Sequence, residues 1–291
     1  LVTTKRGRQG KPTISFDAYY GVQQLPELYD MNNTDQYIEI SQEAFDNYNS
    51  EYGYSVGDAE FRELHPDLQP GSRYRNINTP WVDDVTKDAP SQNYNLSVSG
   101  GTDKLNYHVS TAYLSQEAVV DRWDLKRYSF RANSDYKVND RIKFGQTFNI
   151  SNRTIERGMS GGGDGYLLSG AASMPPFFEI YENEFNTFPE NRYGYSGNFN
   201  VANMTLQNAN GVNQIVDNFS NSVRILGGLN AEVMLFKGLT FKSAASLDLS
   251  FSRSESWSPG YTGQELGIDR SQNNYNDSRG TGSTQVYTNT L

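Results

Sequence analysis

The sequence predicts an all-β protein, an antiparallel transmembrane β-barrel, and three observations support this prediction. Only 36 % of the 291 residues are hydrophobic, yet 13 % are aromatic and 20 are Tyr, which is too aromatic for a disordered chain and poor in apolar residues for a large buried core. The longest unbroken apolar run is Val233–Phe236, whereas a spanning helix needs about 20 apolar residues. Apolar and polar residues alternate in many segments, as in barrel strands that face lipid on one side and water on the other.

Seven segments alternate with period two and are predicted as strands. They cover residues 13–23, 92–99, 105–114, 125–136, 142–151, 222–235 and 239–254. In each segment one face carries aliphatic and aromatic residues, and the other carries mainly small polar or charged residues. The last residues, 287–291, have the composition of a strand that has only begun. We therefore expect about seven strands plus the start of an eighth.

The connections between these strands alternate between short and long. Short turns are expected at 100–104, 137–141 and 236–238, and the long connections span 24–91, 115–124, 152–221 and 255–283. Outer-membrane barrels have short periplasmic turns and longer extracellular loops, so this parity favours a barrel over a soluble sandwich. The first long connection also contains one predicted short helix, which Asn33 would cap together with Gln36 three positions on.

Tyrosines bracket the apolar face of the fourth predicted strand. Tyr128 and Tyr136 are eight residues apart, which is about 26 Å along a strand. At a tilt near 45° this becomes about 19 Å along the membrane normal, close to the height of an apolar band between two aromatic girdles. Tyr is also simply a common strand residue, so each single Tyr is only weak support.

The composition excludes several kinds of function. With 25 Lys and Arg against 34 Asp and Glu, the net charge is −9, and we expect no nucleic-acid partner because affinity for phosphate needs clustered basic residues. The chain has no Cys and two His, His65 and His108, so neither a Cys-ligated zinc nor a multi-histidine metal site is available. The glycine-rich run 160–165 lacks the Gly-Lys-Ser/Thr that completes a phosphate loop.

Two acidic groups in the long connections have an alternative interpretation. Asp83 and Asp84 form one group, and Glu179, Glu182 and Glu184 form the other. Paired carboxylates are used in glycoside hydrolysis and in calcium binding, but no further residue supports either chemistry here. We interpret both groups as solvated loop charge, and we predict that the protein is not an enzyme and has no metal and no cofactor.

Several stretches of the sequence are similar to SusC/RagA-type TonB-dependent transporters. The early barrel of that family is matched by residues 78–81, 89–101, 105–107, 113–120 and 126–133. Residues 1–7 look like the end of the family's plug domain, and Met174-Pro175-Pro176 resembles a motif in its long outer loop. The similarity is strongest over residues 1–25 and 78–150.

The resemblance implies a 22-stranded barrel with an N-terminal plug, in the outer membrane of a Bacteroidetes-type bacterium. Residues 1–10 would be the C-terminal end of the plug, and residues 11–291 the first part of the barrel, with extracellular loops near 24–91, 152–221 and 255–283. The family imports large solutes, glycans or oligopeptides, under a SusD-like lipoprotein lid. TonB supplies the energy through an N-terminal segment that we expect to be missing from this chain.

The resemblance also suggests roles for two sets of residues. Polar strand residues would line the lumen or touch the plug: Arg127, Arg131, Asn133, Lys143, Arg224, Asn230, Lys242 and Asp248. Loop aromatics would stack on substrate or cover the lipoprotein: Trp81, Trp123, Phe177, Phe178, Tyr181, Tyr193 and Tyr195. The alternative for each polar residue is plain solvation, and the alternative for each aromatic residue is packing within its own loop.

Two other classes of protein remain open from the sequence. The first is a soluble all-β carbohydrate-binding or glycoside-hydrolase domain, which would cover the apolar face of its sheet with a second layer of protein. The second is a structural or adhesive barrel of the autotransporter kind, which would have neither a plug nor a lipoprotein partner. Extraction behaviour separates the first class from a transporter, and association with a SusD-like lipoprotein separates the second.

Overall fold

The fold was analysed in a computed structural model. It describes residues 7, 9–26, 30–52, 73–158, 164–181, 199–201, 204–206, 208–262, 269–270 and 272–291. Tyr193 and Tyr195, two of the predicted substrate contacts, lie outside these residues.

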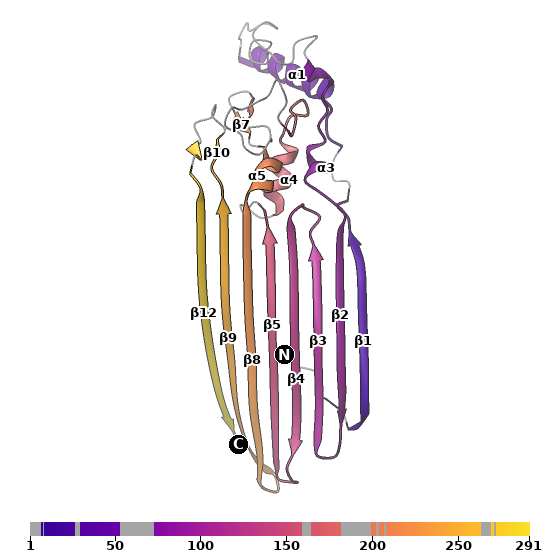
Figure 1. The fold of residues 1–291 in the computed structure, drawn as a ribbon, viewed down its shortest axis with the longest axis vertical. Coiled ribbons are helices and arrows are strands. Elements are labelled where there is room, and N and C mark those ends of the chain that lie inside the picture. Colours follow the sequence, from indigo (N-terminus) through magenta and orange to yellow (C-terminus); the bar gives the residue numbers. More distant parts are fainter. Residues whose placement is uncertain are drawn as a thin grey trace.

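Eight long strands form a single antiparallel sheet, and long strands that follow one another along the chain lie side by side in it (Figure 1). The strands are β1 (Gly10–Gln23), β2 (Ala89–Gly101), β3 (Leu105–Glu117), β4 (Trp123–Lys137), β5 (Ile142–Arg157), β8 (Asp217–Phe236), β9 (Leu239–Ser258) and β12 (Asn274–Thr290). All seven predicted strands are present, and the prediction of an all-β antiparallel architecture is confirmed.

The eighth strand is longer than the sequence predicted. β12 has 17 residues and pairs with β9 from Asn274 to Thr290, so it is a full strand rather than the start of one. Its residues are polar on both faces, and therefore no hydropathy alternation marks it. The expected connection 255–283 is correspondingly shorter, residues 259–273. Residues 24–88 and 158–216 form two further long connections, whereas the one expected at 115–124 is a short turn, residues 118–122.

The connections contain more regular structure than the one short helix that was expected. The helices are α1 (Thr34–Tyr52), the 3-10 turn η2 (Arg73–Asn76), α3 (Trp81–Asp84), α4 (Asp164–Ala172) and α5 (Ala209–Ile215). Two small strand pairs are β6 (Phe199–Val201) with β7 (Met204–Leu206) and β10 (Tyr261–Thr262) with β11 (Asp269–Arg270). The predicted cap of α1 is confirmed: the Gln36 amide donates to Asn33 Oδ1 and the Asn33 amide to Gln36 Oε1, both at 2.9 Å.

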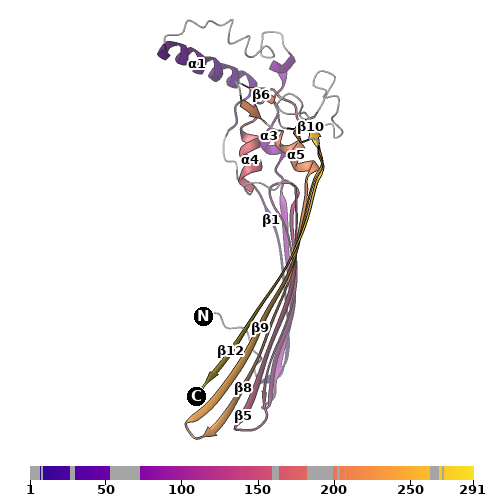
Figure 2. The same cartoon turned by 90° about the vertical axis from the view of Figure 1, so that its left-hand side faces the viewer.

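The helices gather at one end of the sheet, and the tight turns lie at the other end (Figure 1). Seen from the side, the sheet is one twisted, curved layer (Figure 2), as expected from the right-handed twist of strands. None of the described helices is long and apolar enough to cross a membrane.

The pairing register shows that the sheet has one polar and one apolar face. Residues that are directly paired across strands share a face, so a row of paired residues can be followed across the sheet. One row joins Phe130, Ile150, Ile225 and Leu249 on the apolar face. Residues adjacent in sequence point to the opposite face, which carries the polar rows. The predicted alternation therefore continues across neighbouring strands.

Tyrosines form a row on the apolar face near the helical end of the sheet. Tyr94, Tyr113 and Tyr128 are paired across β2, β3 and β4, with ring centroids 6.4 and 4.9 Å apart. Tyr136 lies on the same face of β4, eight residues toward the tight turns, and both Tyr128 and Tyr136 are exposed. The two tyrosines thus bracket the apolar part of β4, as the sequence indicated.

Candidate functional site

The eight polar residues selected from the sequence all lie on the polar face of the sheet. The register places Asn133 opposite His108 and Thr147, and it places Lys143 and Lys242 on either side of Glu232. The complete set follows the same parity: Arg127, Arg131, Asn133, Lys143, Arg224, Asn230, Lys242 and Asp248. These side chains come from four neighbouring strands, β4, β5, β8 and β9, and form one continuous wall.

Cross-strand ion pairs balance the charge of this wall. Arg224 holds Asp248 with two nitrogens, Nε at 2.9 Å and Nη2 at 2.5 Å. Lys242 Nζ lies 2.9 Å from Glu232 Oε1. Solvent-exposed pairs of this kind contribute little to stability. Their main effect is to give the wall both signs of charge and many donors and acceptors.

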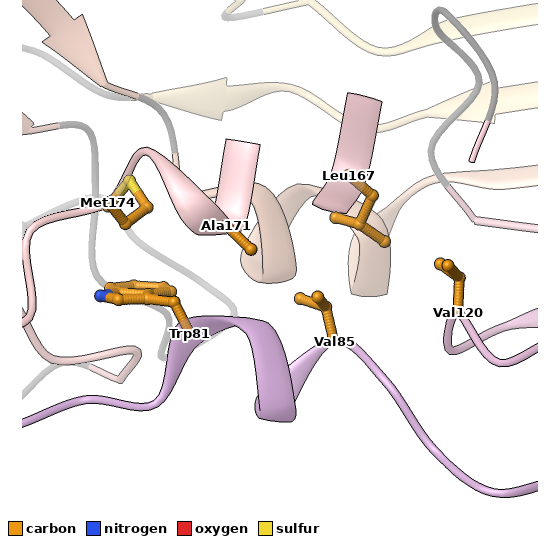
Figure 3. Close-up of a cluster of buried hydrophobic side chains, with 6 residues drawn as sticks. All are labelled: Trp81, Val85, Val120, Leu167, Ala171 and Met174. Atoms are coloured by element: carbon orange, nitrogen blue, oxygen red, sulfur yellow. The ribbon is translucent and has the colours of Figure 1, made fainter. Parts of the chain in front are cut away.

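A compact structure, here called the cap, covers the helical end of the sheet. It consists of α3, α4, α5, the β3–β4 connection (118–122) and the segment 173–181. Its centre is an apolar cluster to which three separate stretches of chain contribute (Figure 3). The buried members are Trp81, Val85, Val120, Leu167, Ala171 and Met174. The cap therefore joins excursions that are distant in sequence, and it has a small hydrophobic core separate from the sheet.

Hydrogen bonds from the start of α3 and from the residues just before it fix this part of the chain to the Met-Pro-Pro stretch. Trp81 Nε1 donates to the Pro175 carbonyl at 3.0 Å, and the Thr79 amide donates to the Pro176 carbonyl at 2.8 Å. Thr79 Oγ1 donates to the Phe178 carbonyl at 2.6 Å. The two motifs noted in the sequence, around residues 78–81 and 174–176, are thus packed against each other.

Arg122, which the sequence did not single out, joins the β3–β4 connection to the end of α5. Its Nη1 donates to the carbonyls of Asn213 and Gln214, both at 2.6 Å, and to that of Val216 at 3.2 Å, and its Nη2 pairs with Asp217. A guanidinium at a helix C-terminus satisfies the carbonyls that have no partner within the helix. Arg122 also has a positive φ of 62°, a conformation that is uncommon outside Gly.

Asparagines supply the remaining polar contacts of α5. Asn208 caps the helix by accepting from the Gly211 amide at 2.9 Å, and its own amide donates to the Ile180 carbonyl at 2.9 Å. Asn213 Nδ2 donates to the Asp121 carbonyl at 3.2 Å, and Asn210 Nδ2 donates to Asp84. In the sequence this stretch looks like an Asn-rich loop, and the only signal of its role is the N-cap Asn followed by apolar residues.

The described loop aromatics fall into three groups by exposure. Trp81 is 3 % exposed and Phe177 is 2 % exposed: both rings fill the cap, and Phe177 packs against Tyr37 and Phe178, which agrees with the alternative of packing within the loops. Trp123 and Phe178 are half-buried at the edge of the cluster. Tyr181 is exposed. Packing within the loops explains the buried members, because the chain needs large apolar side chains where little else is apolar.

A cavity of about 490 Å³ lies beside the cap, between the start of α1 and the segments 78–83 and 171–176. Its floor includes Trp81 and Met174, and its polar lining includes Asn33, Asn78 and Ser173. The described residues contain no cluster of His, Cys, Asp or Glu that could hold a metal ion. The acidic pair Asp83 and Asp84 is split between an exposed side chain and one that faces Asn210.

The carboxyl group of Asp84 gives a test of the cap's electrostatics. Burial raises its pKa, the hydrogen bond from Asn210 opposes this, and the nearby charge of Asp121 adds to it. A raised folded-state pKa means that the ionised carboxylate costs stability at neutral pH and that this cost falls as the group is protonated. We therefore expect Asp84→Asn to protect α3 and α5 from hydrogen exchange at least as well as the wild type at neutral pH, with the advantage shrinking toward about pH 4.

The matched control for this prediction is Asp83→Asn, because Asp83 is the exposed neighbour. That variant should leave the pH dependence of exchange in residues 81–85 and 209–215 unchanged. Loss of protection in Asp84→Asn at neutral pH would show that the ionised group stabilises the cap and would contradict the prediction.

The three sequence relatives described below are all named TonB-dependent receptors. No family model matches the sequence. The chain is 28 % identical over 200 residues to TonB-dependent receptor P3 of Formosa agariphila, which covers 67 % of this chain and 17 % of that protein. It is 29 % identical over 211 residues to TonB-dependent receptor P26 of the same organism, with 71 % and 19 % covered. It is 24 % identical over 189 residues to TonB-dependent receptor SusC of Bacteroides thetaiotaomicron, with 63 % and 16 % covered.

Solved structures show the same fold over nearly the whole chain. The RagAB peptide importer in its closed-closed state superposes with a TM-score of 0.70 at 19 % identity, over 98 % of this chain and 33 % of that one. The RagAB peptide transporter gives 0.71 at 18 % identity, with the same coverage. The chain thus spans about a third of the solved chains, and the matched regions span less than a fifth of the curated relatives. The eight-stranded sheet corresponds to part of a β-barrel.

Proposed function

We propose, from the premise that this chain is part of a SusC/RagA-type TonB-dependent transporter, that the complete protein imports a large solute across the bacterial outer membrane. The import would be driven through TonB, and the complete protein would be a multi-pass barrel in that membrane. In this proposal the polar face lines the lumen and the apolar face contacts lipid. The chain would act by binding and passage, with no catalytic residue and no cofactor.

The observation that carries the proposal is the two-faced sheet. Large apolar side chains remain exposed along the apolar face, including Ile14 and Phe16 of β1 at 70 and 64 %. A soluble all-β binding or hydrolase domain would cover such a face with a second layer, because exposed apolar patches of this size favour association. In a membrane, lipid would cover this face, and the exposed apolar side chains would not drive association. The row of Tyr94, Tyr113 and Tyr128 has the position of an interfacial aromatic girdle.

The ends of the sheet suggest where the other components would act. The cap lies at the end with the long connections, which faces the outside in an outer-membrane barrel, and we assign the docking of a SusD-like lipoprotein to that end. Residues 1–10 would lead to the plug, the part on which TonB pulls. Gly7 lies so close to β3 that a Cβ there would be 2.2 Å from the Tyr107 carbonyl oxygen, which fits a segment that packs directly against the sheet at this point.

The substrate class in the proposal is a large glycan or an oligopeptide, with no nucleic acid. The structural relatives are named as peptide transporters, and one sequence relative is SusC. The polar wall, which presents ion pairs and many amide and hydroxyl groups, suits either class. Among the candidate aromatics that the structure describes, Tyr181 is the exposed one, and we assign stacking on the substrate to it.

The test is fractionation and uptake with the complete protein in its own host. We expect it in the outer membrane, soluble only in detergent, and we expect deletion of its gene to abolish growth on one polymeric glycan or peptide source. Inactivating TonB should abolish the same growth, whereas growth on the monosaccharides or free amino acids should be unchanged as a control. Recovery of the complete protein in the soluble fraction would contradict the proposal.

A further inference from the structure

Two arginines face each other across neighbouring strands on the polar face of the sheet, at the end near the cap. Arg127 on β4 and Arg153 on β5 are directly paired in register, and both are exposed. Within the described part of the chain neither has an ion-pair partner. Like charges directly opposite each other destabilise a sheet, so the pair does not serve to hold these strands together.

The surroundings of the pair on the same face leave its charge unbalanced. The nearest positions in its own row and in the two adjacent rows are small polar or aliphatic residues: Leu114, Leu125, Ser129, Ser151, Ile155 and Ser222. Between the row of Trp123 and the row of Arg131, the described strands β2 to β12 place one carboxylate on this face, Asp248. Arg224 already holds that carboxylate with two nitrogens.

The acidic residues at this level point to the other face of the sheet. Glu117 is paired with Asp124, and Asp124 with Glu156, so these three share a face. They lie an odd number of residues from the arginines of the same strands, and side chains alternate between faces along a strand. In a chain of net charge −9, the polar face therefore carries an excess of positive charge near the cap.

The spacing of Arg127 and Arg153 fits one oxyanion. Directly paired side chains in an antiparallel sheet have Cβ atoms about 4.5–5.5 Å apart, so both guanidinium groups can reach the same ligand. Each group presents its N–H donors in a planar fork that matches the oxygens of a carboxylate or a sulfate. The hydroxyls of Ser129 and Ser151, which are paired in the adjacent row, can bind hydroxyl groups of the same ligand.

The pair lies near the outer mouth of the proposed lumen. Arg127 precedes Tyr128 of the tyrosine row, and it is four residues from the cap end of β4 and ten from the other end. The segment that leads to the proposed plug meets the sheet farther toward the tight turns. Gly7 lies against Tyr107, which pairs with Ser134, and Ser134 is about 23 Å along β4 from Arg127. A solute that enters from the cap end would meet the arginines before it reached that level.

We infer that Arg127 and Arg153 bind the carboxylate or sulfate groups of an acidic glycan, so that the imported solute is an anionic polysaccharide fragment. The inference deepens the proposed function and rests on it. A glycan with an acid group in each repeat presents one sign of charge, and Arg131, about 13 Å from Arg127 along β4, can receive a further group. A peptide of mixed sequence carries both signs, and this patch would repel its basic residues.

Binding of charged and neutral probes to the complete protein in detergent tests the site. Dextran sulfate oligosaccharide and dextran form one matched pair of probes, and oligogalacturonate and its methyl ester form another. By isothermal titration calorimetry, we expect the wild type to bind at least one charged probe and to bind neither neutral one. Arg127→Gln should raise the Kd about tenfold, and Arg127→Gln combined with Arg153→Gln should raise it about 30-fold or more. The charged probe that binds more tightly distinguishes a sulfate site from a carboxylate site.

The matched control is Lys126→Gln. Lys126 is the exposed neighbour of Arg127 in the sequence and points to the opposite face, so its loss should change the Kd by less than about twofold. Arg127→Lys keeps the charge but loses the planar fork, and its Kd should lie between those of the wild type and Arg127→Gln. If the double variant does not insert into the membrane, Arg127→Gln and Lys126→Gln decide.

The outcomes separate this inference from the proposed function. Failure of both charged glycans to bind, or equal weakening in Arg127→Gln and Lys126→Gln, overturns the anion site and leaves the transporter proposal standing. Binding of poly-L-glutamate in place of the charged glycans also overturns it, because the solute would then be a peptide. Absence of the complete wild-type protein from the outer membrane overturns both.

Discussion

Replacing Trp81 by alanine is expected to cost the cap about 3–5 kcal/mol of local stability, the usual range for truncating a buried aromatic residue. The indole is 3 % exposed and lies among Val85, Ala171 and Met174, and its Nε1 hydrogen bond to Pro175 is lost with it. Because the cluster is small, few neighbours can move to fill the space. Hydrogen exchange in residues 81–85 and 167–171 of the complete protein measures the effect.

Two control variants separate the contribution of the ring from that of its N–H group, and they distinguish packing from substrate contact. Trp81→Phe keeps most of the ring and removes the indole N–H, so it should cost about 1–3 kcal/mol, mainly from the unpaired Pro175 carbonyl. Tyr181→Ala removes an exposed aromatic residue and should change local stability by no more than about 0.5 kcal/mol. Wild-type exchange in Trp81→Ala would mean that the ring is not a core residue of the cap.

The second large effect is expected at Arg122. Removing its side chain in Arg122→Ala leaves the carbonyls of Asn213, Gln214 and Val216 without their donor and Asp217 without its counter-ion. Hydrogen bonds to a charged group are worth about 1.5–3 kcal/mol each, and they share one side chain, so we expect a loss of about 2–4 kcal/mol at α5. Faster exchange in residues 209–217, with β5 unchanged, is the expected result.

Arg122→Gly separates the contacts from the backbone conformation. The positive φ at this position costs a non-glycine residue about 1 kcal/mol or more. Glycine adopts a positive φ without this cost. Arg122→Gly should therefore be less damaging than Arg122→Ala by about that amount. Equal exchange in the two variants would show that the conformation carries no strain, and unchanged exchange in both would show that the guanidinium does not hold α5.

The sheet was predictable because the residue pattern of a strand depends on what lies against each of its two faces. A strand that is wet on one side and apolar on the other must alternate, and this held for the seven segments with such an environment. β12 was predicted only over its last residues, 287–291, because its two faces are alike, with Ser283 and Thr284 both polar.

The cap was not predictable for a different reason. Its contacts join residues about 90 positions apart, such as Arg122 with Asn213 and Trp81 with Pro175, and no local pattern contains that information. The polar wall was found because parity alone places Arg224 or Lys242 on a face. The burial of Trp81 and Phe177 depends on which loops meet, so the sequence left both a substrate contact and packing within the loop open for these aromatics.

The long reach of the cap's contacts also sets an order of assembly. Closing a long loop costs entropy before the distant contacts can form, and the cluster of the cap is complete only when residues 167–174 pack against the stretches around Trp81 and Val120. Until then, the halves of the cluster around Trp81 and Val120 remain uncovered. A barrel that assembles strand by strand would therefore pass through a stage in which the apolar residues of these loops are exposed and prone to aggregation. That stage would end when the cap is complete.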